Sequence, residues 1–362
     1  MQVVLSPTAT EDQIKRVKER IREFGLTPHD IPGQEPKTIG ITGTINQEIR
    51  IYLEGLPAVS KVIPISPPFK LASRDMHPEN SFVTVGDVKF GDGNVVMIAG
   101  PCAVESEEQT LRIAREVADR GAQILRGGAY KPRTSPYSFQ GLGELGLEIL
   151  AKARELTGLP IVTEVLDHTT VELVGQYADM LQIGTRNMQN FSLLKASGQS
   201  RKPVLLKRGM SATLQETLMS VEYLMSYGCH DVVVCERGVR TFTSHARNTL
   251  DVSVIPAFKQ ISHLPIIVDP SHSSGQRYSV IPHALAGLGA GADGLIVDVH
   301  DHPEEALCDG PQALIPNEFS KLMKTAKGVC AAMGKSIGSD QFLNPSHNGK
   351  TANTPHKMSQ QP

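Results

Sequence analysis

The chain has 362 residues, a formal net charge of −2 and five cysteines. A charge so near zero gives no general attraction to nucleic acid or to acidic membranes. No apolar stretch approaches the roughly 18 residues of a membrane span, and the first residues lack the pattern of a secretory signal. An odd number of cysteines in a chain of this size does not suggest a disulfide framework. We therefore expect a globular cytoplasmic protein that binds neither nucleic acid nor membrane.

The first seventy residues predict a small α+β domain. A strand at 3–5 precedes an amphipathic helix at 11–24, which Thr10 can cap and Gly25 can end. Strands at 28–31 and 38–42 follow, and then a short helix at 47–56 and a strand at 58–65. The order βαββαβ is that of a ferredoxin-like domain, which we expect at 1–70. Such a domain can bind a regulatory ligand, support assembly, or only pack against the rest of the chain.

A linker and a hairpin are expected next. The segment 66–75 contains two prolines, and residues 82–90 with the turn Gly91-Asp92-Gly93 predict a β-hairpin. Because it precedes the first long apolar run, the hairpin would close the N-terminal end of a barrel.

From residue 95 onward, short apolar runs alternate with stretches of helical spacing. Runs of Val, Ile and Leu bounded by Gly or Pro are typical of parallel strands buried on both faces. Helical spacing at 107–120, 144–157, 213–226, 246–261 and 279–289 supplies crossovers between the strands. About eight such units match the ~250 residues of a (β/α)₈ TIM barrel, which we expect at 71–335. The runs lie at 95–100, 122–126, 159–164, 180–184, 203–207, 231–236, 264–269 and 294–298.

The end of the chain has a different composition. It is rich in Asn, Ser, Pro, Gly and Gln and almost free of apolar residues. We expect a disordered tail at 336–362, so that His347 and His356 give no indication of a metal site.

Four residues that can bind metal stand where the barrel strands end. Cys102 and His272 follow apolar runs, Asp298 closes one, and Asp309 follows a turn-like segment. Carboxyl ends of parallel strands gather at one face of a barrel, where this fold keeps its chemistry. A thiolate, an imidazole and two carboxylates are compatible with Zn²⁺, Fe²⁺, Mn²⁺ or Co²⁺. The other cysteines are interpreted as small apolar core residues: Cys229, Cys235, Cys308 and Cys330.

The remaining strand ends carry an unusual number of cations. Any one of them is compatible with a solvated loop residue, but together at one face they repel each other unless anions bind. Arg and Lys both suit phosphate and carboxylate groups, so we expect a ligand with several negative charges. The cations are Arg126, Lys131, Arg133, Arg186, Lys207, Arg208, Arg237 and Arg240.

Several motifs resemble one enzyme family. The stretch at 125–141 (LRGGAYKPRTSPYSFQG) and the segments at 99–106 (AGPCAVES), 182–190 (QIGTRNMQN) and 267–275 (IVDPSHSSG) are similar to 3-deoxy-D-arabino-heptulosonate 7-phosphate (DAHP) synthases. The segments at 206–210 (LKRGM) and 235–242 (CERGVRTF) add to the match, which runs in order over about residues 70–335. The resemblance is to the branch with a ferredoxin-like domain before the barrel.

The resemblance implies a reaction and a ligand set. These enzymes condense phosphoenolpyruvate with erythrose 4-phosphate and release phosphate, the first step of the shikimate pathway. A divalent metal ion, a homo-oligomer and an aromatic amino acid effector are implied as well. The implied phosphoenolpyruvate-binding residues are Arg126, Lys131, Arg186, Lys207 and Arg237. Arg133 and Thr134 would bind the erythrose 4-phosphate, and the implied metal ligands are Cys102, His272, Asp298 and Asp309.

Two residues are given catalytic roles by the same resemblance. Lys131 would donate a proton to the new hydroxyl, and Glu164 would lie near the water that attacks C2 of phosphoenolpyruvate. We expect neighbouring cations to lower the pKa of Lys131. One position departs from the family, which normally has Glu where this chain has Asp298. The shorter side chain withdraws its carboxylate by roughly 1.5 Å, which predicts weaker metal binding or a changed metal preference.

Three alternative functions are compatible with the sequence. A 3-deoxy-D-manno-octulosonate 8-phosphate synthase shares the barrel but uses a five-carbon sugar phosphate. Lys131-Pro132-Arg133-Thr134 and the front domain favour the shorter sugar, because the alternative enzyme usually has an Asn-containing loop there. A Schiff-base aldolase would use Lys131 or Lys207. A catalytically silent sensor of phosphorylated metabolites is supported only by Asp298.

Overall fold

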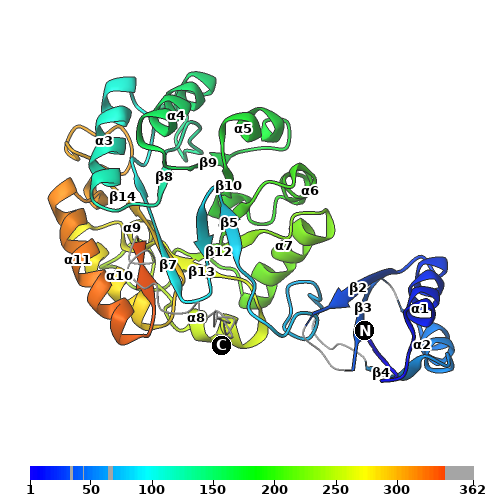
Figure 1. Cartoon of the computed structure of the whole chain (residues 1–362). Coiled ribbons are helices and arrows are strands. Elements are labelled where there is room, and N and C mark those ends of the chain that lie inside the picture. The colour runs from blue at the N-terminus through cyan, green and yellow to red at the C-terminus, as the bar shows by residue number, and fades with distance from the viewer. Residues whose placement is uncertain (33–35, 44, 64–67, 339–362) are drawn as a thin grey trace, which may run out of the picture.

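The structure is a computed structural model that describes residues 1–32, 36–43, 45–63 and 68–338. A barrel of parallel strands ringed by helices occupies most of it, and a smaller domain lies to one side (Figure 1). Within the described residues, no helix is long and apolar enough to cross a membrane. The predicted cytoplasmic location stays a prediction.

The smaller domain has the predicted ferredoxin-like plan. Its four-stranded antiparallel sheet has the order β2-β3-β1-β4, with β1 at Gln2–Leu5, β2 at Thr27–Ile31, β3 at Thr38–Thr42 and β4 at Val59–Ile63. Helices α1 (Glu11–Glu23) and α2 (Gln47–Glu54) cross between the strands. Thr10 and Gln13 form a capping box at the start of α1, and its apolar face is buried. Residues 64–65 of the predicted fourth strand lie outside the described residues.

A short hairpin closes the N-terminal end of the barrel, as predicted. Its strands are β5 (Val83–Val85) and β6 (Val88–Phe90), so the turn lies between them at 86–87. The prediction had placed the turn at Gly91–Gly93, which instead leads into the first barrel strand through a bridge from Gly91 to Asn94. Val83, Val85 and Phe90 pack against inward-facing residues from all eight barrel strands. The lower end of the barrel is therefore filled with apolar side chains.

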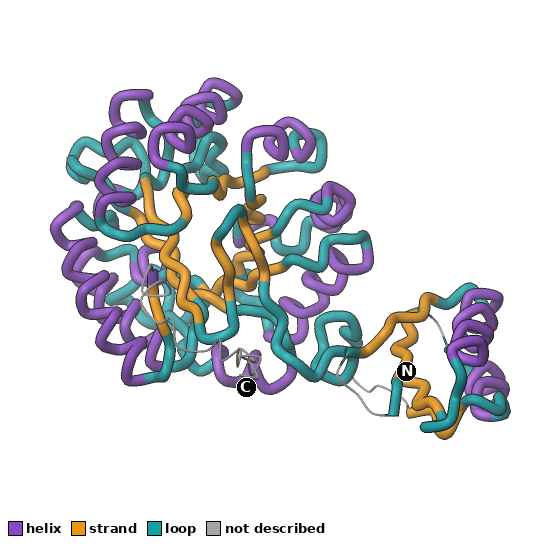
Figure 2. Tube along the Cα trace, in the orientation of Figure 1, coloured by secondary structure: helices purple, strands orange, loops and turns teal. Residues whose placement is uncertain are grey.

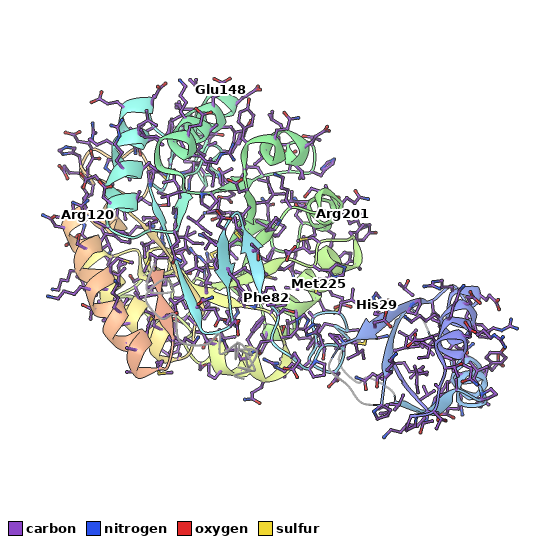
Figure 3. The ribbon with its side chains drawn as sticks, viewed as in Figure 1. His29, Phe82, Arg120, Glu148, Arg201 and Met225 are labelled. Carbon is purple, nitrogen blue, oxygen red and sulfur yellow. The ribbon has the colours of Figure 1, made fainter. Side chains whose placement is uncertain are left out.

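The predicted barrel is confirmed. Eight parallel strands follow each other in chain order, and β14 pairs with β7 to close the ring. The strands are β7 (Asn94–Gly100), β8 (Ile124–Arg126), β9 (Ile161–Val165), β10 (Met180–Ile183), β11 (Val204–Lys207), β12 (Val232–Glu236), β13 (Ile266–Val268) and β14 (Gly294–Asp298). A ring of helices surrounds them (Figure 2). Exposed side chains of this outer ring, such as Glu148, point away from the barrel (Figure 3).

The predicted crossover helices are present, with one correction and several additions. The helix predicted at 246–261 begins only at residue 254, because residues 247–249 bond to loops of the barrel mouth instead. Helices α5, α6, α9 and α11 and the 3₁₀ turns η1 and η2 were not predicted. The elements are α3 (Glu107–Asp119), α4 (Glu144–Thr157), α5 (Val171–Tyr177), η1 (Thr185–Asn187), α6 (Phe191–Ser200), α7 (Leu214–Ser226), α8 (Val254–Ile261), α9 (Pro270–Ser274), α10 (Arg277–Gly289), η2 (Gly310–Gln312) and α11 (Pro316–Ala332).

The described segments directly before and after the barrel are more ordered than a simple linker and a disordered tail would be. Arg74 donates to the backbone oxygen of Lys259 at 2.7 Å, and Leu71 and Ala72 donate through their backbone to Glu222. At the other end, the predicted tail begins with a short strand, β15 (Ser336–Ile337), beside β7. The rest of that tail, residues 339–362, lies outside the described residues. The domain limits near residues 70 and 335 stay predictions.

Candidate active site

A cavity of about 520 Å³ opens at the C-terminal ends of the barrel strands. Its lining contains two carboxylates, Glu164 and Asp309, and a much larger number of cations. Such a surplus favours ligands that carry several negative charges. Eight cations line it: Arg126, Lys131, Arg133, Arg186, Lys207, Arg237, Arg240 and Arg247.

The cations of the predicted phosphoenolpyruvate set lie deep in this cavity, apart from Arg186. Arg126, Lys131, Lys207 and Arg237 are each less than a tenth exposed. Within the described residues, no carboxylate lies at ion-pair distance from Arg237, and burial lowers its pKa. A buried guanidinium without a paired carboxylate is costly unless a ligand supplies the anion. This residue therefore favours an anionic group bound in the buried part of the cavity.

The residues predicted to hold the sugar phosphate lie nearer the entrance. Thr134 is exposed, and its hydroxyl accepts from Nη2 of Arg186 at 3.4 Å. Arg133 is half-buried and donates to the sulfur of Cys308 at 2.9 Å. The loop after β8 thus places a second group of polar donors above the buried cations.

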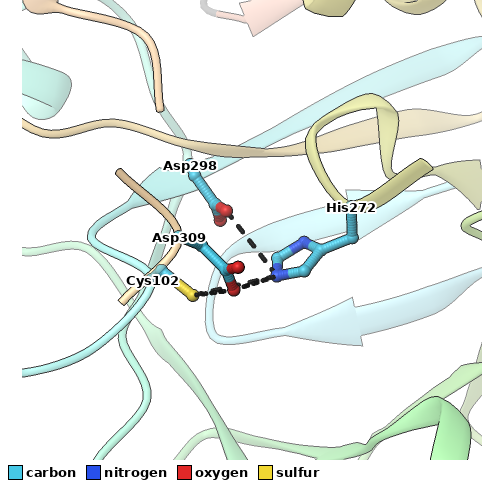
Figure 4. A group of neighbouring side chains, drawn as sticks. All are labelled: Cys102, His272, Asp298 and Asp309. Carbon is cyan, nitrogen blue, oxygen red and sulfur yellow. Dashed lines mark hydrogen bonds and ion pairs between the residues drawn. The ribbon is translucent and has the colours of Figure 1, made fainter. Parts of the chain in front are cut away.

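The four candidate metal ligands meet beside this cavity, although they are up to 207 residues apart in the chain (Figure 4). Sγ of Cys102 lies 3.2 Å from Oδ2 of Asp309 and 3.8 Å from Nε2 of His272. The same His272 nitrogen is 3.6 Å from Oδ2 of Asp298 and 3.6 Å from Oδ2 of Asp309. All four ligand atoms lie within 4.8 Å of one another.

These distances fit a divalent transition metal. A tetrahedral centre with bonds of 2.1–2.3 Å has edges of about 3.4–3.8 Å between its ligand atoms. The separations of 3.6 and 3.8 Å fall in or at the edge of that range and the one of 3.2 Å lies just below it, so that a small adjustment would complete the coordination. The side chain of Asp298 reaches the group despite its shorter length.

His272 is oriented by a carboxylate behind it. Asp269 caps the short helix α9 by accepting from the backbone N–H of His272, and its carboxylate also lies 2.9 Å from Nδ1 of that residue. Lys207 donates to the same carboxylate at 2.6 Å. Burial acts to lower the pKa of His272, but Asp269 and Asp298 outweigh it and raise that pKa to about 10. Because Nδ1 faces Asp269, Nε2 is the ring nitrogen that faces the cluster.

Lys131 and Arg126 pair with the cluster. Nζ of Lys131 lies 3.2 Å from the sulfur of Cys102 and 3.0 Å from its backbone oxygen, and Arg126 donates to Oδ1 of Asp298. Gly128 lets Lys131 take this path, since a Cβ there would lie 2.5 Å from the lysine side chain. Burial lowers the pKa of Lys131, but the two thiols and Glu164 raise it above its usual range. The expected lowering was therefore wrong.

Glu164 also lines the cavity. It stands on β9, and Oε2 accepts from the amide of Gln182 on β10 at 3.3 Å. A Cβ at Gly184 would lie 1.9 Å from Oε1 of Glu164. Glycine is therefore required at this strand end if Glu164 is to keep its position.

Two interpretations of single residues need correction. Arg208 does not line the cavity but pairs with Glu236 at 2.8 Å and Asp251 at 2.9 Å, because its side chain turns outward from β11. Cys308 is buried, as expected of a core residue, yet it lines the cavity and its sulfur lies 3.5 Å from that of Cys102. Its position directly before Asp309 was the available signal.

Sequence reasoning also missed the residues that support the ligands. Asp269 stands three positions before His272, a spacing that allows both a helix cap and a ring contact. Gln312 and Arg247 contact Asp298 and Asp309 through loops, and no motif marked them.

The fold and the site define a (β/α)₈-barrel enzyme with a cationic cavity beside a Cys/His/Asp/Asp metal centre. The chain belongs to the DAHP synthetase I family, whose sequence model matches residues 69–333. The model of the DAHP synthase ferredoxin-like domain matches residues 1–67.

Individual relatives agree with this membership. The chain is 47% identical over 337 residues to the phospho-2-dehydro-3-deoxyheptonate aldolase of Thermotoga maritima, which covers 93% of this chain and 100% of the relative. The crystal structure of the aldolase of that name from the same organism superimposes with a TM-score of 0.74 at 46% identity, over 93% of this chain and 99% of that one. A 2-dehydro-3-deoxyphosphooctonate aldolase of Syntrophotalea carbinolica is 34% identical over 268 residues, which are 68% of this chain and 95% of the relative.

Proposed function

We propose that the chain condenses phosphoenolpyruvate with erythrose 4-phosphate and water, giving DAHP and phosphate. Family membership and the close Thermotoga maritima relative support DAHP synthase activity. The observation that carries the assignment to this site is the cavity lined by eight cations beside the four metal-binding side chains. The two substrates bring two phosphates and one carboxylate, which match that surplus of positive charge.

The buried cations would hold phosphoenolpyruvate. Arg126, Lys131, Lys207 and Arg237 all line the cavity and are each less than a tenth exposed. Arg186 would close this set from the turn after β10. Arginine forks and lysine point charges together fix a phosphate and a carboxylate in one orientation.

The sugar phosphate would bind above, with its phosphate on Arg133 and Thr134. Its aldehyde then faces the cluster of Cys102, His272, Asp298 and Asp309. Those four side chains would hold a divalent ion, which would supply Lewis acidity at the aldehyde. Mn²⁺, Fe²⁺, Zn²⁺ and Co²⁺ all suit the donor set.

The remaining steps use side chains on either side of the substrates. The enol carbon of phosphoenolpyruvate bonds to the aldehyde carbon, and Lys131 would deliver a proton to the oxygen that becomes a hydroxyl. Water adds at C2, where Glu164 would orient it, and the C2 intermediate loses inorganic phosphate. Glu164 is itself oriented by Gln182 and by the space that Gly184 leaves.

The front domain would act as a regulatory unit. Each residue with a proposed chemical role lies beyond Gly100, and the first 67 residues match a domain model named for this enzyme class. We propose that an aromatic amino acid binds this domain and lowers turnover, and that the enzyme is a homo-oligomer.

A phosphate-release assay tests the reaction. Purified chain with Mn²⁺ should release phosphate only when both substrates are present, and mass spectrometry should detect a seven-carbon sugar acid phosphate. Replacing erythrose 4-phosphate by a five-carbon aldose phosphate tests the alternative reaction of a 3-deoxy-D-manno-octulosonate 8-phosphate synthase. Faster turnover with the five-carbon sugar would reverse the substrate assignment. Trapping of substrate on lysine by borohydride would favour a Schiff base instead.

A further inference from the structure

Two side chains that the proposed mechanism does not use connect the carboxylates of the metal centre. Gln312 is buried, and its Nε2 donates to Oδ2 of Asp298 at 2.7 Å. Nη2 of Arg247 donates to Oε1 of the same glutamine at 2.7 Å, and Nη1 donates to Oδ1 of Asp309 at 3.3 Å. One guanidinium and one amide therefore reach both carboxylates.

The backbone holds Arg247 in this place. Its N–H donates to the oxygen of Ser274 at 3.0 Å, and Nη2 donates to the backbone oxygen of His272 at 3.4 Å. The next residue, Asn248, donates to Ser273 at 2.9 Å, and Thr249 pairs with Val239. The segment thus runs along the loop that carries the imidazole ligand. Arg247 therefore contacts the segments that supply two of the four candidate ligands, His272 and Asp309, and reaches a third, Asp298, through Gln312.

The position of Asp298 explains why such support matters. Its Oδ1 accepts from the buried guanidinium of Arg126, while Oδ2 faces His272 at 3.6 Å. An arginine fork can hold both oxygens of a carboxylate, which would draw Oδ2 away from the cluster. The amide of Gln312 holds Oδ2 against that pull. A short aspartate has little reach with which to compensate for a rotation.

We propose that Arg247 and Gln312 are positioning residues that keep Asp309 and Asp298 turned towards the metal, and thereby set the affinity of the centre for a divalent ion. The inference rests on the metal centre of the proposed function. Outer partners of metal ligands are typically worth ten- to a hundredfold in metal affinity. Arg247 acts through Asp309 and through Gln312, so the two residues form one unit.

A purely electrostatic effect and a positioning role predict opposite changes in metal affinity when Arg247 is replaced. Removing a cation near the centre should, by Coulomb's law alone, strengthen the binding of a dication. Loss of a positioning contact should weaken it. At Gln312 a neutral substitution leaves the charge unchanged, so that only positioning is tested.

The experiment measures Co²⁺ binding to the metal-free, full-length protein by competition with a chelator, together with the visible absorption of bound Co²⁺. Gln312→Met and Arg247→Met should each bind Co²⁺ about ten- to a hundredfold more weakly and show an altered spectrum. Arg247→Lys should recover part of the loss. The double variant should lose less than the two single losses combined, because Arg247 acts partly through Gln312.

The matched control is Arg240→Met, which removes another arginine of the same cavity. Within the described residues, the side chain of Arg240 contacts only the sulfur of Met210, at 4.0 Å. Its Co²⁺ affinity should be unchanged or slightly higher, and a loss equal to that of Arg247→Met would overturn the inference. Thermal unfolding of each metal-free variant checks its fold, and Arg247→Met alone decides the question if Gln312→Met does not fold.

Failure of this inference differs from failure of the metal centre itself. If Cys102→Ala abolishes Co²⁺ binding while Gln312→Met and Arg247→Met bind as the wild type does, only the positioning role is wrong. If Cys102→Ala also binds normally, the centre is not where the proposed function puts it.

Discussion

The sulfur atoms of Cys102 and Cys308 lie 3.5 Å apart, although the two residues are 206 positions apart in the chain. One is a candidate metal ligand and the other directly precedes a candidate metal ligand. Arg133 donates to the second sulfur at 2.9 Å, so this thiol is in contact with a cation. Neighbouring thiols of this kind favour oxidation to a disulfide when a peroxide is present.

Oxidation of the metal-free protein should therefore abolish metal binding. Hydrogen peroxide converts one thiol to a sulfenic acid, the other thiol displaces water from it, and a Cys102–Cys308 disulfide results. Peptide mapping without reductant should detect that bond, and dithiothreitol should restore Co²⁺ binding. Cys308→Ser should form no such bond and should recover less after peroxide. Equal, reductant-reversible inactivation of wild type and Cys308→Ser would refute the pairing.

Removing the thiolate ligand should remove the metal. We expect Cys102→Ala to lose most bound metal and nearly all turnover while it stays folded, because the other three side chains keep only part of the coordination. Metal content by mass spectrometry and unfolding by circular dichroism check the two parts of this expectation. Cys229→Ala, at a buried thiol remote from the cluster, is the control. Wild-type turnover of Cys102→Ala after chelator treatment would exclude the metal site.

The two substrates should respond differently to the loop after β8. Arg133→Ala should raise the KM for erythrose 4-phosphate about ten- to a hundredfold and change that for phosphoenolpyruvate much less. The loss of one charge-assisted contact is worth about 1.5–3 kcal/mol. Steady-state kinetics with each substrate varied in turn give the comparison, with Arg120→Ala on the outer ring as control (Figure 3). Equal changes in both constants would mean that the pockets have been divided wrongly.

His263 should make stability depend on pH. Its Nε2 lies 2.8 Å from the backbone oxygen of Leu71 and its Nδ1 lies 2.8 Å from the hydroxyl of Ser81, so the neutral ring joins the linker to the barrel. Burial lowers its pKa to about 4 from the ordinary histidine value of about 6.5. The unfolded chain therefore takes up the proton first as the pH falls. The contribution is complete above the unfolded pKa and is lost between about pH 6.5 and 4.

The expected loss from this one residue is about 2 kcal/mol on going from pH 7.5 to pH 5. Urea unfolding of wild type and His263→Gln at both pH values measures it, since the variant lacks the titrating ring. Between pH 7.5 and pH 5, the wild type should lose that much more unfolding free energy than the variant does. A difference that does not change with pH would show that His263 titrates normally in the folded protein.

Truncation should separate catalysis from regulation. A chain that starts at Ser66 should still make the seven-carbon product but lose inhibition by Tyr or Phe. It retains Leu71, Ala72 and Arg74, whose bonds attach the linker to the barrel. Assays of both chains with and without each amino acid decide the matter. A truncated enzyme that is still inhibited, or a full-length enzyme indifferent to both, would leave the domain with a packing or assembly role.

The barrel could be predicted because its strands are apolar on both faces. Apolar runs such as 95–100 and 294–298 are typical of strands buried on both faces. They also locate the strand ends at or after which the candidate ligands lie. Helix α5 was missed because it spans only seven residues, too few for a clear period. Residues 246–253 have helical spacing but form no helix, because the backbone N–H groups of Arg247 and Asn248 donate to Ser274 and Ser273 instead.

The clustering of the four candidate ligands could be predicted from the sequence more readily than the residues that contact them. Cys102, His272 and Asp298 are fixed by strand ends, which a linear pattern reveals. Gln312 and Arg247 depend on the path of two loops, one of which passes through a left-handed backbone at Asp309. Gln312 and Asp298 are 14 residues apart, and Arg247 and Asp309 are 62 residues apart. Because loop geometry creates these contacts, no periodic pattern in the sequence indicates them.

The hairpin that fills the lower end of the barrel leaves the mouth as the route by which substrates reach the cavity. With the proposed assignment, phosphoenolpyruvate lies on the buried cations, and the sugar phosphate lies above it on Arg133 and the exposed Thr134. A sugar that arrived first would stand in the way of its co-substrate. Turnover should consequently follow a compulsory order with phosphoenolpyruvate leading, so that a dead-end analogue of the sugar traps phosphoenolpyruvate on the enzyme and does not expel it.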